Sequence, residues 1–192
     1  MMTVSIVILA GGEGSRIGGN KGLQLLRGKP LVRWVLDAVR EQGGELLISA
    51  NGPGYEDFGC RVIADEMPGM GPLGGLQAAL RLAQNALVMS VPCDVPFLPY
   101  DLAACLLAGL GEADAAVAVV AGKRQPAIAL YRQSVLPRLD AYLTKGERRV
   151  GSFLDGLGAR EVEFTDAKKF ININTKEELE SAGLDSQLID NE

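Results

Sequence analysis

The chain has 192 residues and a mass of 20.3 kDa, which predicts one domain over residues 1–192 with a core that needs no disulfide or metal. Its net charge is −5 and its pI about 4.9, which argues against a protein held by bulk charge on nucleic acid or an anionic membrane. It contains no histidine, so Ser-His-Asp catalysis, Cys-His catalysis and histidine-containing zinc sites are excluded.

Cysteine usage and the N-terminal sequence both indicate the cytoplasm. Cys60, Cys93 and Cys105 form no CxxC pair, which is typical of free thiols in a reducing compartment. The apolar run at residues 4–9 has no basic segment before it and ends at glycines, so it predicts a buried strand rather than a signal peptide or a membrane span.

The first half of the chain alternates predicted strands and helices. A glycine-rich loop over 10–22 follows the first strand, and a helix begins near Pro30 and ends before Gly43. Short apolar runs predict strands over 45–49, 60–64 and 86–91, with a helix over 73–84 before the last of them.

The second half continues this alternation with one hairpin. We predict a helix over 101–110, then a strand over 115–120 that pairs with 127–130 across a polar turn at 122–125. Helices over 135–143 and 150–157 and a strand over 161–164 follow. Thr175 and Glu178 form a capping box that opens a last helix, which ends near Ala182, and the tail over 184–192 is expected to fray.

This alternation predicts an α/β fold with a mostly parallel central sheet. Ligands of such sheets bind beyond the carboxyl ends of the strands. The loops that follow the first four strands contain Lys21, Asn51, Asp65 and Asp94. We therefore expect the chemistry of this protein to lie where these four residues converge.

The first of these loops has the composition of a phosphate-binding loop. It contains five glycines between Gly11 and Gly19, together with Arg16 and Lys21. It is not a P-loop, because Asn20 stands where GxxxxGK[ST] requires lysine, and it fails GxGxxG because Ile17 replaces the third glycine. The alternative is an ordinary flexible loop between a strand and a helix.

Each of the other polar residues has two interpretations. Asp94, braced by Pro92 and Pro96, is either a Mg²⁺ ligand or a turn residue. Asp65 is either a ligand contact or a solvated turn residue. Asn51 is either a ligand contact or a turn residue, because it precedes Gly52 in a dipeptide that favours turns. Cys93 has no histidine that could activate it as a nucleophile.

Two further groups of polar residues lie near the C-terminus. Arg148 and Arg149 place two adjacent cations between two predicted helices, where a solvated loop is the alternative. Asn172 and Asn174 alternate with isoleucines, so both amides share one face of an extended segment. They could read the edge of a heterocycle or cap the last helix.

These motifs together resemble the molybdenum cofactor guanylyltransferases over nearly the whole chain. The matching elements are the LAGG at 9–12, the stretches at 16–22 and 28–31, Asp65, the GPLGG at 71–75, the PCD at 92–94, Gln125-Pro126, the GERR at 146–149 and the run over 172–179. The family has a Rossmann-like nucleotidyltransferase fold with three layers, and it attaches GMP from GTP to molybdopterin and releases pyrophosphate. One departure is that Asn20 replaces the usual aspartate before the lysine, in a loop one residue shorter.

The resemblance implies a role for individual residues. Catalysis would rest on Asp94, Lys21 and Arg16, with Asp94 holding Mg²⁺ as the cofactor. The implied contacts with GTP are Leu9, Ala10, Gly11, Gly12, Lys21, Asn51, Asp65 and Asp94. The implied contacts with the pterin are Arg148, Arg149, Asn172 and Asn174. The implied partners are GTP, molybdopterin and proteins that deliver and receive the cofactor. Neither nucleic acid nor a membrane is an expected partner.

The reaction needs no general base, because a phosphate monoester with a second pKa near ~6 is already an anionic nucleophile at neutral pH. The alternatives are a CTP-dependent molybdopterin cytidylyltransferase, a sugar-phosphate nucleotidyltransferase and a nucleotide-binding or cofactor-binding module without turnover. The sequence at 9–12 resembles the guanine-selecting version. We expect the backbone of Leu9, Ala10 and Gly11 to leave the sheet with unpaired groups that recognise guanine.

Overall fold

The structure, a computed structural model, describes residues 3–11, 20–65 and 69–184. Its strands are β1 (Val4–Leu9), β2 (Leu25–Leu26), β3 (Lys29–Pro30), β4 (Glu45–Ser49), β5 (Arg61–Ile63), β6 (Leu87–Pro92), β7 (Ala115–Val120), β8 (Lys123–Arg132) and β9 (Arg160–Phe164). Its α-helices are α1 (Leu31–Val39), α2 (Pro72–Leu82), α3 (Leu102–Leu110), α4 (Leu136–Thr144), α5 (Val150–Leu157) and α6 (Lys176–Leu184). No helix in the described ranges is long and apolar enough to cross a membrane.

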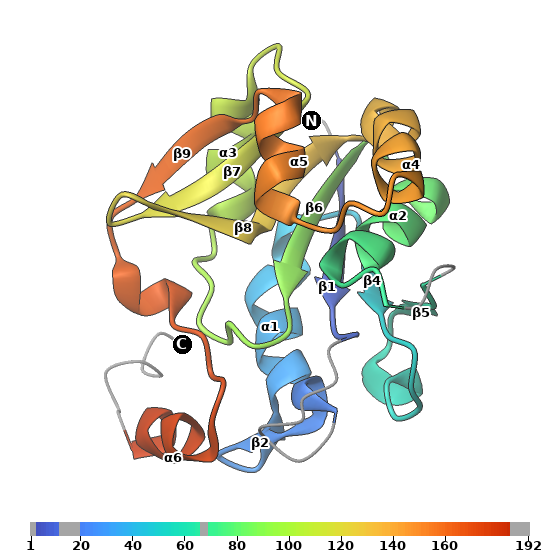
Figure 1. Cartoon of the computed structure of the whole chain (residues 1–192). Helices are drawn as coiled ribbons and strands as arrows, with labels where there is room; N and C mark the ends of the chain where they lie inside the picture. Colours follow the sequence, from blue (N-terminus) through green and yellow to red (C-terminus); the bar gives the residue numbers. More distant parts are fainter. Residues whose placement is uncertain (1–2, 12–19, 66–68, 185–192) are drawn as a thin grey trace.

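The described strands form one large sheet in the order β5-β4-β1-β6-β8-β7-β9 and a separate small hairpin, β2–β3. β1 pairs in parallel with β4 and β6, β4 with β5, and β7 with β9. Only β8 runs antiparallel to its neighbours in this sheet, β6 and β7. The prediction of a mostly parallel sheet is confirmed, and β1, β4, β5 and β6 end at one edge (Figure 1).

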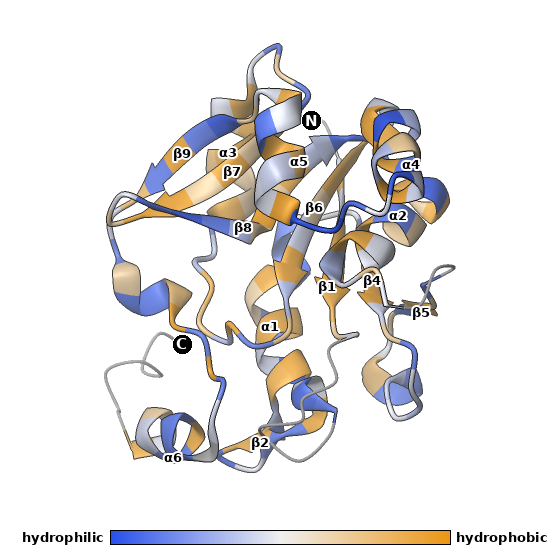
Figure 2. Cartoon of the chain, viewed as in Figure 1, coloured by the Kyte–Doolittle hydropathy of each residue, from blue (hydrophilic) through white to orange (hydrophobic). Residues whose placement is uncertain are grey.

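Helices cover both faces of the sheet, which confirms the three-layer α/β architecture (Figure 1). Along β1, Ile6 and Ile8 pack in the cluster formed with α1 and α3, whereas Val7 packs in the cluster formed with α2, α4 and α5. Because both faces are covered, β1 and β4 are mostly hydrophobic, while the outer strand β9 is more hydrophilic (Figure 2).

The turn that we predicted at 122–125 is wrong. β8 already begins at Lys123, and Val120 pairs with Lys123 across a two-residue turn. Both turn residues, Ala121 and Gly122, have positive φ angles (49° and 71°), as the tight hairpin turns that match strand twist require. The polar start of β8 is exposed, and it therefore looked like a loop in the sequence.

A third, smaller hydrophobic cluster joins segments that lie far apart in the chain. It brings Leu26 of the β2–β3 hairpin and Leu31 of α1 together with Phe97, Ile173 and Ala182. The sequence did not predict this hairpin. Because this cluster includes Ile173 and Ala182, the segment before α6 lies near the carboxyl ends of the strands, close to β2 (Figure 1).

The predicted capping box of the last helix is confirmed. Thr175 Oγ1 accepts a hydrogen bond from the backbone amide of Glu178 at 3.1 Å, and Glu178 Oε2 accepts one from the amide of Thr175 at 3.1 Å. α6 runs to Leu184, so it extends beyond the predicted end near Ala182 and includes the first residue of the tail that we expected to fray over 184–192. The rest of that tail, from residue 185 onwards, lies outside the described residues.

Candidate active site

The carboxyl ends of the parallel strands enclose a cavity of about 230 Å³. Leu9 and Gly11 line it from the end of β1, Ser49 from the end of β4, and Asp94 from the loop after β6. Its other lining residues include Lys21, Asp65, Gly71, Pro72, Gly75, Pro92, Cys93 and Ala127. The structure therefore brings together most of the residues that the sequence assigned to the nucleotide.

Asp65 is held in place by two neighbouring side chains. Ser49 Oγ donates to Asp65 Oδ1 at 2.8 Å, and Asn51 Nδ2 donates to Asp65 Oδ2 at 3.3 Å. The amide of Asp65 donates in return to Asn51 Oδ1 at 2.9 Å. Asn51 thus belongs to the site through Asp65. Sequence reasoning missed Ser49, although a hydroxyl at the last position of an apolar strand was a usable signal.

Glycines let α2 approach these strand ends closely. A Cβ on Gly75 would lie 2.3 Å from Ser49 Oγ and 3.0 Å from Leu9 Cδ2. A Cβ on Gly74 would lie 3.2 Å from Asp65 Oδ2. Gly74 and Gly75 of the GPLGG motif therefore let α2 pack closely against Asp65 and Ser49, and the first turn of α2 forms one wall of the cavity.

Lys21 and Asp94, which both line this cavity, form an ion pair. Lys21 Nζ lies 2.5 Å from Asp94 Oδ2 and 2.5 Å from Asn174 Oδ1. The side chains of Lys21 and Asp94 keep only 17% and 14% of their surface exposed. The short loop with Asn20 thus still delivers the ammonium group to Asp94. The other oxygen, Asp94 Oδ1, is buried without a hydrogen-bond partner in the described part of the chain.

Cys93 faces the same cavity but is unsuited to nucleophilic chemistry. Burial, with a smaller contribution from the neighbouring charge of Asp94, raises the pKa of its thiol to about 12, although the Lys21 ammonium group lowers it in part. The thiol is therefore protonated at neutral pH. All three cysteines are free, as predicted.

The backbone at 9–11 differs from our expectation. The Ala10 amide donates to the Ser49 carbonyl at 2.8 Å, and the Leu9 carbonyl accepts from the Cys93 amide at 3.2 Å. Both groups were expected to be unpaired, but β1 lies between β4 and β6, so its two neighbours extend the pairing by one residue. The described residues provide no backbone hydrogen-bond partner for the Ala10 carbonyl or the Gly11 amide.

The residues that we assigned to the pterin lie in two places. Arg148 Nη1 donates to the Gly69 carbonyl at 3.2 Å, which brings the loop between α4 and α5 to the segment that enters α2. The side chain of Arg149 is exposed, and its carbonyl accepts from the Tyr142 hydroxyl at 3.0 Å. Asn172 and Asn174 are both exposed beside the fully buried Ile173, as alternation predicts, but only Asn174 contacts Lys21. Gly12 and Arg16 lie outside the described residues.

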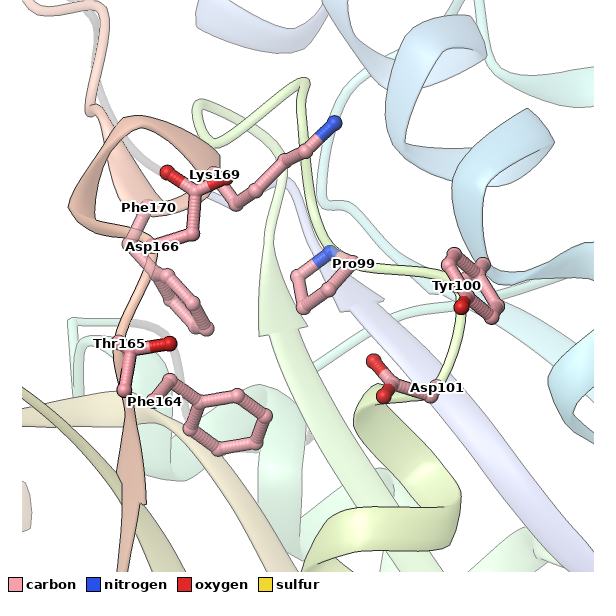
Figure 3. A pocket seen from close by; sticks show the side chains of 8 residues that line it. All are labelled: Pro99, Tyr100, Asp101, Phe164, Thr165, Asp166, Lys169 and Phe170. Atoms are coloured by element: carbon pink, nitrogen blue, oxygen red, sulfur yellow. The ribbon is translucent and has the colours of Figure 1, made fainter. Parts of the chain in front are cut away.

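A second cavity, of about 560 Å³, lies between the start of α3 and the end of β9. Figure 3 shows Phe164 and Phe170 on one side of it and Pro99, Tyr100 and Asp101 on the other. It is larger than the first cavity, but it contains none of the residues that the sequence assigned to the site. The first cavity is therefore the candidate site because polar groups converge on it at the strand ends, and not because of its size.

Comparisons with known proteins agree with this geometry. A family model described as a MobA-like NTP transferase domain matches residues 6–161. A molybdenum cofactor guanylyltransferase of Yersinia pseudotuberculosis is 44% identical over 174 residues, which cover 88% of this chain and 89% of the relative. A protein of the same name from Cupriavidus metallidurans is 41% identical over 184 residues, covering 90% and 91%.

Solved structures show the same fold. The molybdopterin-guanine dinucleotide biosynthesis protein A of Archaeoglobus fulgidus superposes with a TM-score of 0.76 at 25% identity and covers 93% of this chain and 96% of its own. The 2-C-methyl-D-erythritol 4-phosphate cytidylyltransferase of Thermus thermophilus has a TM-score of 0.71 at 18% identity, covering 95% and 98%, and shares the fold alone. By sequence and by structure, this chain belongs to the molybdenum cofactor guanylyltransferase family of MobA-like NTP transferases.

Proposed function

We propose that this protein transfers GMP from GTP to molybdopterin, forming molybdopterin guanine dinucleotide and releasing pyrophosphate. The observation that carries the proposal is the convergence of Lys21, Asp65 and Asp94 on one cavity at the strand ends, in a chain of this family. An ammonium group beside a carboxylate whose other oxygen has no partner among the described residues is suited to a triphosphate and its cation. The protein would act in the cytoplasm, with partner proteins that supply the pterin and accept the product.

The chain's own residues would bind and align rather than move protons. The attacking group is the terminal phosphate of molybdopterin, an anion at neutral pH, and the target is the α-phosphorus of GTP. A new P–O bond forms as the bond to pyrophosphate breaks, so no base is needed. Lys21 would contact the triphosphate oxygens, with Arg16 as a second cation, and reduce the repulsion between the two anions.

Asp94 fits a role as a Mg²⁺ ligand. Its Oδ1 is buried without a partner in the described part of the chain, while Oδ2 accepts from Lys21. No group of three or more possible metal ligands occurs among the described residues. Asp94 would therefore share the cation with phosphate oxygens and water, as Mg²⁺ sites commonly do. When bound, Mg²⁺ would neutralise charge on the triphosphate and the leaving pyrophosphate.

The nucleoside would lie between β1, β4 and β5. The Ala10 carbonyl and the Gly11 amide supply one acceptor and one donor at the end of β1, beside Leu9. The Asp65 carboxylate, oriented by Ser49 and supported by Asn51, supplies further acceptors for N–H or O–H groups of guanosine. Gly12, at the start of the loop, completes the proposed nucleotide contacts. Arg148, Arg149 and Asn172 would contact the pterin substrate.

Pyrophosphate release, measured with each of GTP, CTP, ATP and UTP, with and without molybdopterin, tests this proposal. We expect release that depends on molybdopterin and a preference for GTP over CTP of roughly a hundredfold in kcat/KM, since two unpaired groups would cost on the order of 1–3 kcal/mol each with cytosine. Equal or better use of CTP would identify a cytidylyltransferase instead. Binding of GTP without any release would identify a module without turnover.

A further inference from the structure

Lys21 is shared between two side chains that approach it from distant parts of the chain. Its Nζ atom donates to Asp94 Oδ2 at 2.5 Å and to Asn174 Oδ1 at 2.5 Å, and Asn174 is 153 residues away in sequence. An ammonium group has three donors. With one given to the carboxylate and one to the amide, a single N–H remains for a third acceptor.

Asn174 is itself fixed from both sides. The backbone N–H of Asn174 donates to Glu178 Oε2 at 2.6 Å. The same oxygen accepts from the backbone N–H of Thr175 in the capping box of α6. On its other side, the amide of Ile173 donates to the Asp94 carbonyl at 2.9 Å, and the Ile173 side chain is fully buried in the cluster with Leu26 and Phe97. Asn174 is therefore tied to α6 and to the backbone of Asp94.

We propose that Asn174 is a positioning residue for Lys21, and that the capping box of α6 sets its position. The inference rests on the proposed function, in which Lys21 contacts the triphosphate. A long lysine side chain that contacts only a carboxylate can fold against it. Its ammonium group is then no longer available to another acceptor. The amide oxygen of Asn174 holds the ammonium group from another direction and, being neutral, does not cancel its charge. The remaining N–H is thereby presented to a phosphate oxygen.

This role makes a different prediction from a direct contact between Asn174 and the pterin. A residue that acts through Lys21 should change GTP binding when no pterin is present, and its effect should disappear once Lys21 is removed. Asn172 is the contrasting residue, because it lies on the same exposed segment and the described structure gives it no contact with Lys21. A pterin contact at Asn172 should affect only the KM for molybdopterin.

The test is a double-mutant cycle read by titration calorimetry of GTP with Mg²⁺, without molybdopterin. We expect Lys21→Ala to weaken GTP binding about 10-fold or more and Asn174→Ala about 3- to 10-fold, since both disturb a charge-assisted contact. In the Lys21→Ala background, Asn174→Ala should change the Kd by less than about twofold. Asn172→Ala should leave the Kd for GTP at the wild-type value.

Variants of the capping box test the second part of the inference, that α6 sets the position of Asn174. Glu178→Ala should weaken GTP binding in the same direction as Asn174→Ala, and Glu178→Gln should restore it, because glutamine retains an acceptor oxygen at this position. Thermal unfolding of each variant separates a local effect from loss of the fold. A Glu178→Ala protein that melts like the wild type and binds GTP equally well would contradict the role of α6.

The outcomes separate this inference from the proposed function. If Lys21→Ala weakens GTP binding and Asn174→Ala does not, or if the two effects add fully, Asn174 does not position Lys21. If Asn174→Ala raises only the KM for molybdopterin, it is a pterin contact. A wild-type protein that binds no GTP overturns the proposed function, and the inference with it.

Discussion

Gly75→Ala places a methyl group where α2 meets the end of β4. The new Cβ would lie 2.3 Å from Ser49 Oγ and 3.0 Å from both Ser49 Cβ and Leu9 Cδ2. Ser49 cannot move aside at low cost, because its side chain is buried and its hydroxyl donates to Asp65 Oδ1 at 2.8 Å. The substitution should therefore displace either the first turn of α2 or the Ser49 hydroxyl.

The sizes of the opposing free-energy changes decide whether Gly75→Ala stabilises or destabilises the protein. Replacing glycine by alanine inside a helix stabilises by about 1 kcal/mol when nothing else changes. Overpacking a filled site costs about 1–3 kcal/mol, and a lost hydrogen bond to a charged group costs about 1.5–3 kcal/mol. The losses exceed the gain, so we expect Gly75→Ala to lower the free energy of unfolding by about 1.5–5 kcal/mol. For a domain of this size the melting temperature should fall by roughly 3–20 °C.

Urea unfolding at equilibrium, followed by circular dichroism, measures this change. Gly156→Ala in α5 is the matched control, because a Cβ there would meet no atom within 4 Å. The same substitution should therefore stabilise the protein at Gly156 by up to about 1 kcal/mol and destabilise it at Gly75. GTP binding should weaken only in Gly75→Ala, since Asp65 loses its orienting partner.

A stability equal to or above that of the wild type would refute the reasoning about Gly75. A second variant locates the source of the strain. Ser49→Ala removes the hydroxyl that the new methyl group would strike, so Gly75→Ala should cost less in a Ser49→Ala background than in the wild type. A fully additive pair would mean that the contact with Ser49 does not cause the loss.

Three further predictions concern the site. Asp94→Asn should reduce turnover by about a hundredfold or more while the circular dichroism spectrum is retained, because the shape is kept and the charge is lost; near-normal turnover would remove Asp94 from the reaction. Since burial raises the pKa of Cys93 to about 12, iodoacetamide at pH 8.5 should leave it unlabelled in the native protein and label it in urea, as mass spectrometry would show. Arg148→Ala should raise the KM for molybdopterin severalfold without changing the Kd for GTP, whereas Lys145→Ala in the same loop should change neither.

The sequence by itself determined the elements that form the proposed nucleotide half of the site. Continuous apolar runs mark strands that are covered on both faces, so β1, β4 and β6 were recognisable from composition alone. Polar residues that directly follow such strands must meet at one edge of a parallel sheet. Asp65 and Asp94 were placed at the site on that basis, and local chemistry was also sufficient for the capping box at Thr175.

Only the tertiary structure decided the contacts between residues far apart in the chain. Periodicity reports which face of an element is buried, but it does not report which strand lies next to it. The insertion of β8 between β6 and β7, the paired backbone at Leu9 and Ala10, and the cluster around Leu26 all depend on long-range packing. That packing also carries Asn174 to Lys21, because burying Ile173 near Asp94 leaves the next side chain beside the ammonium group.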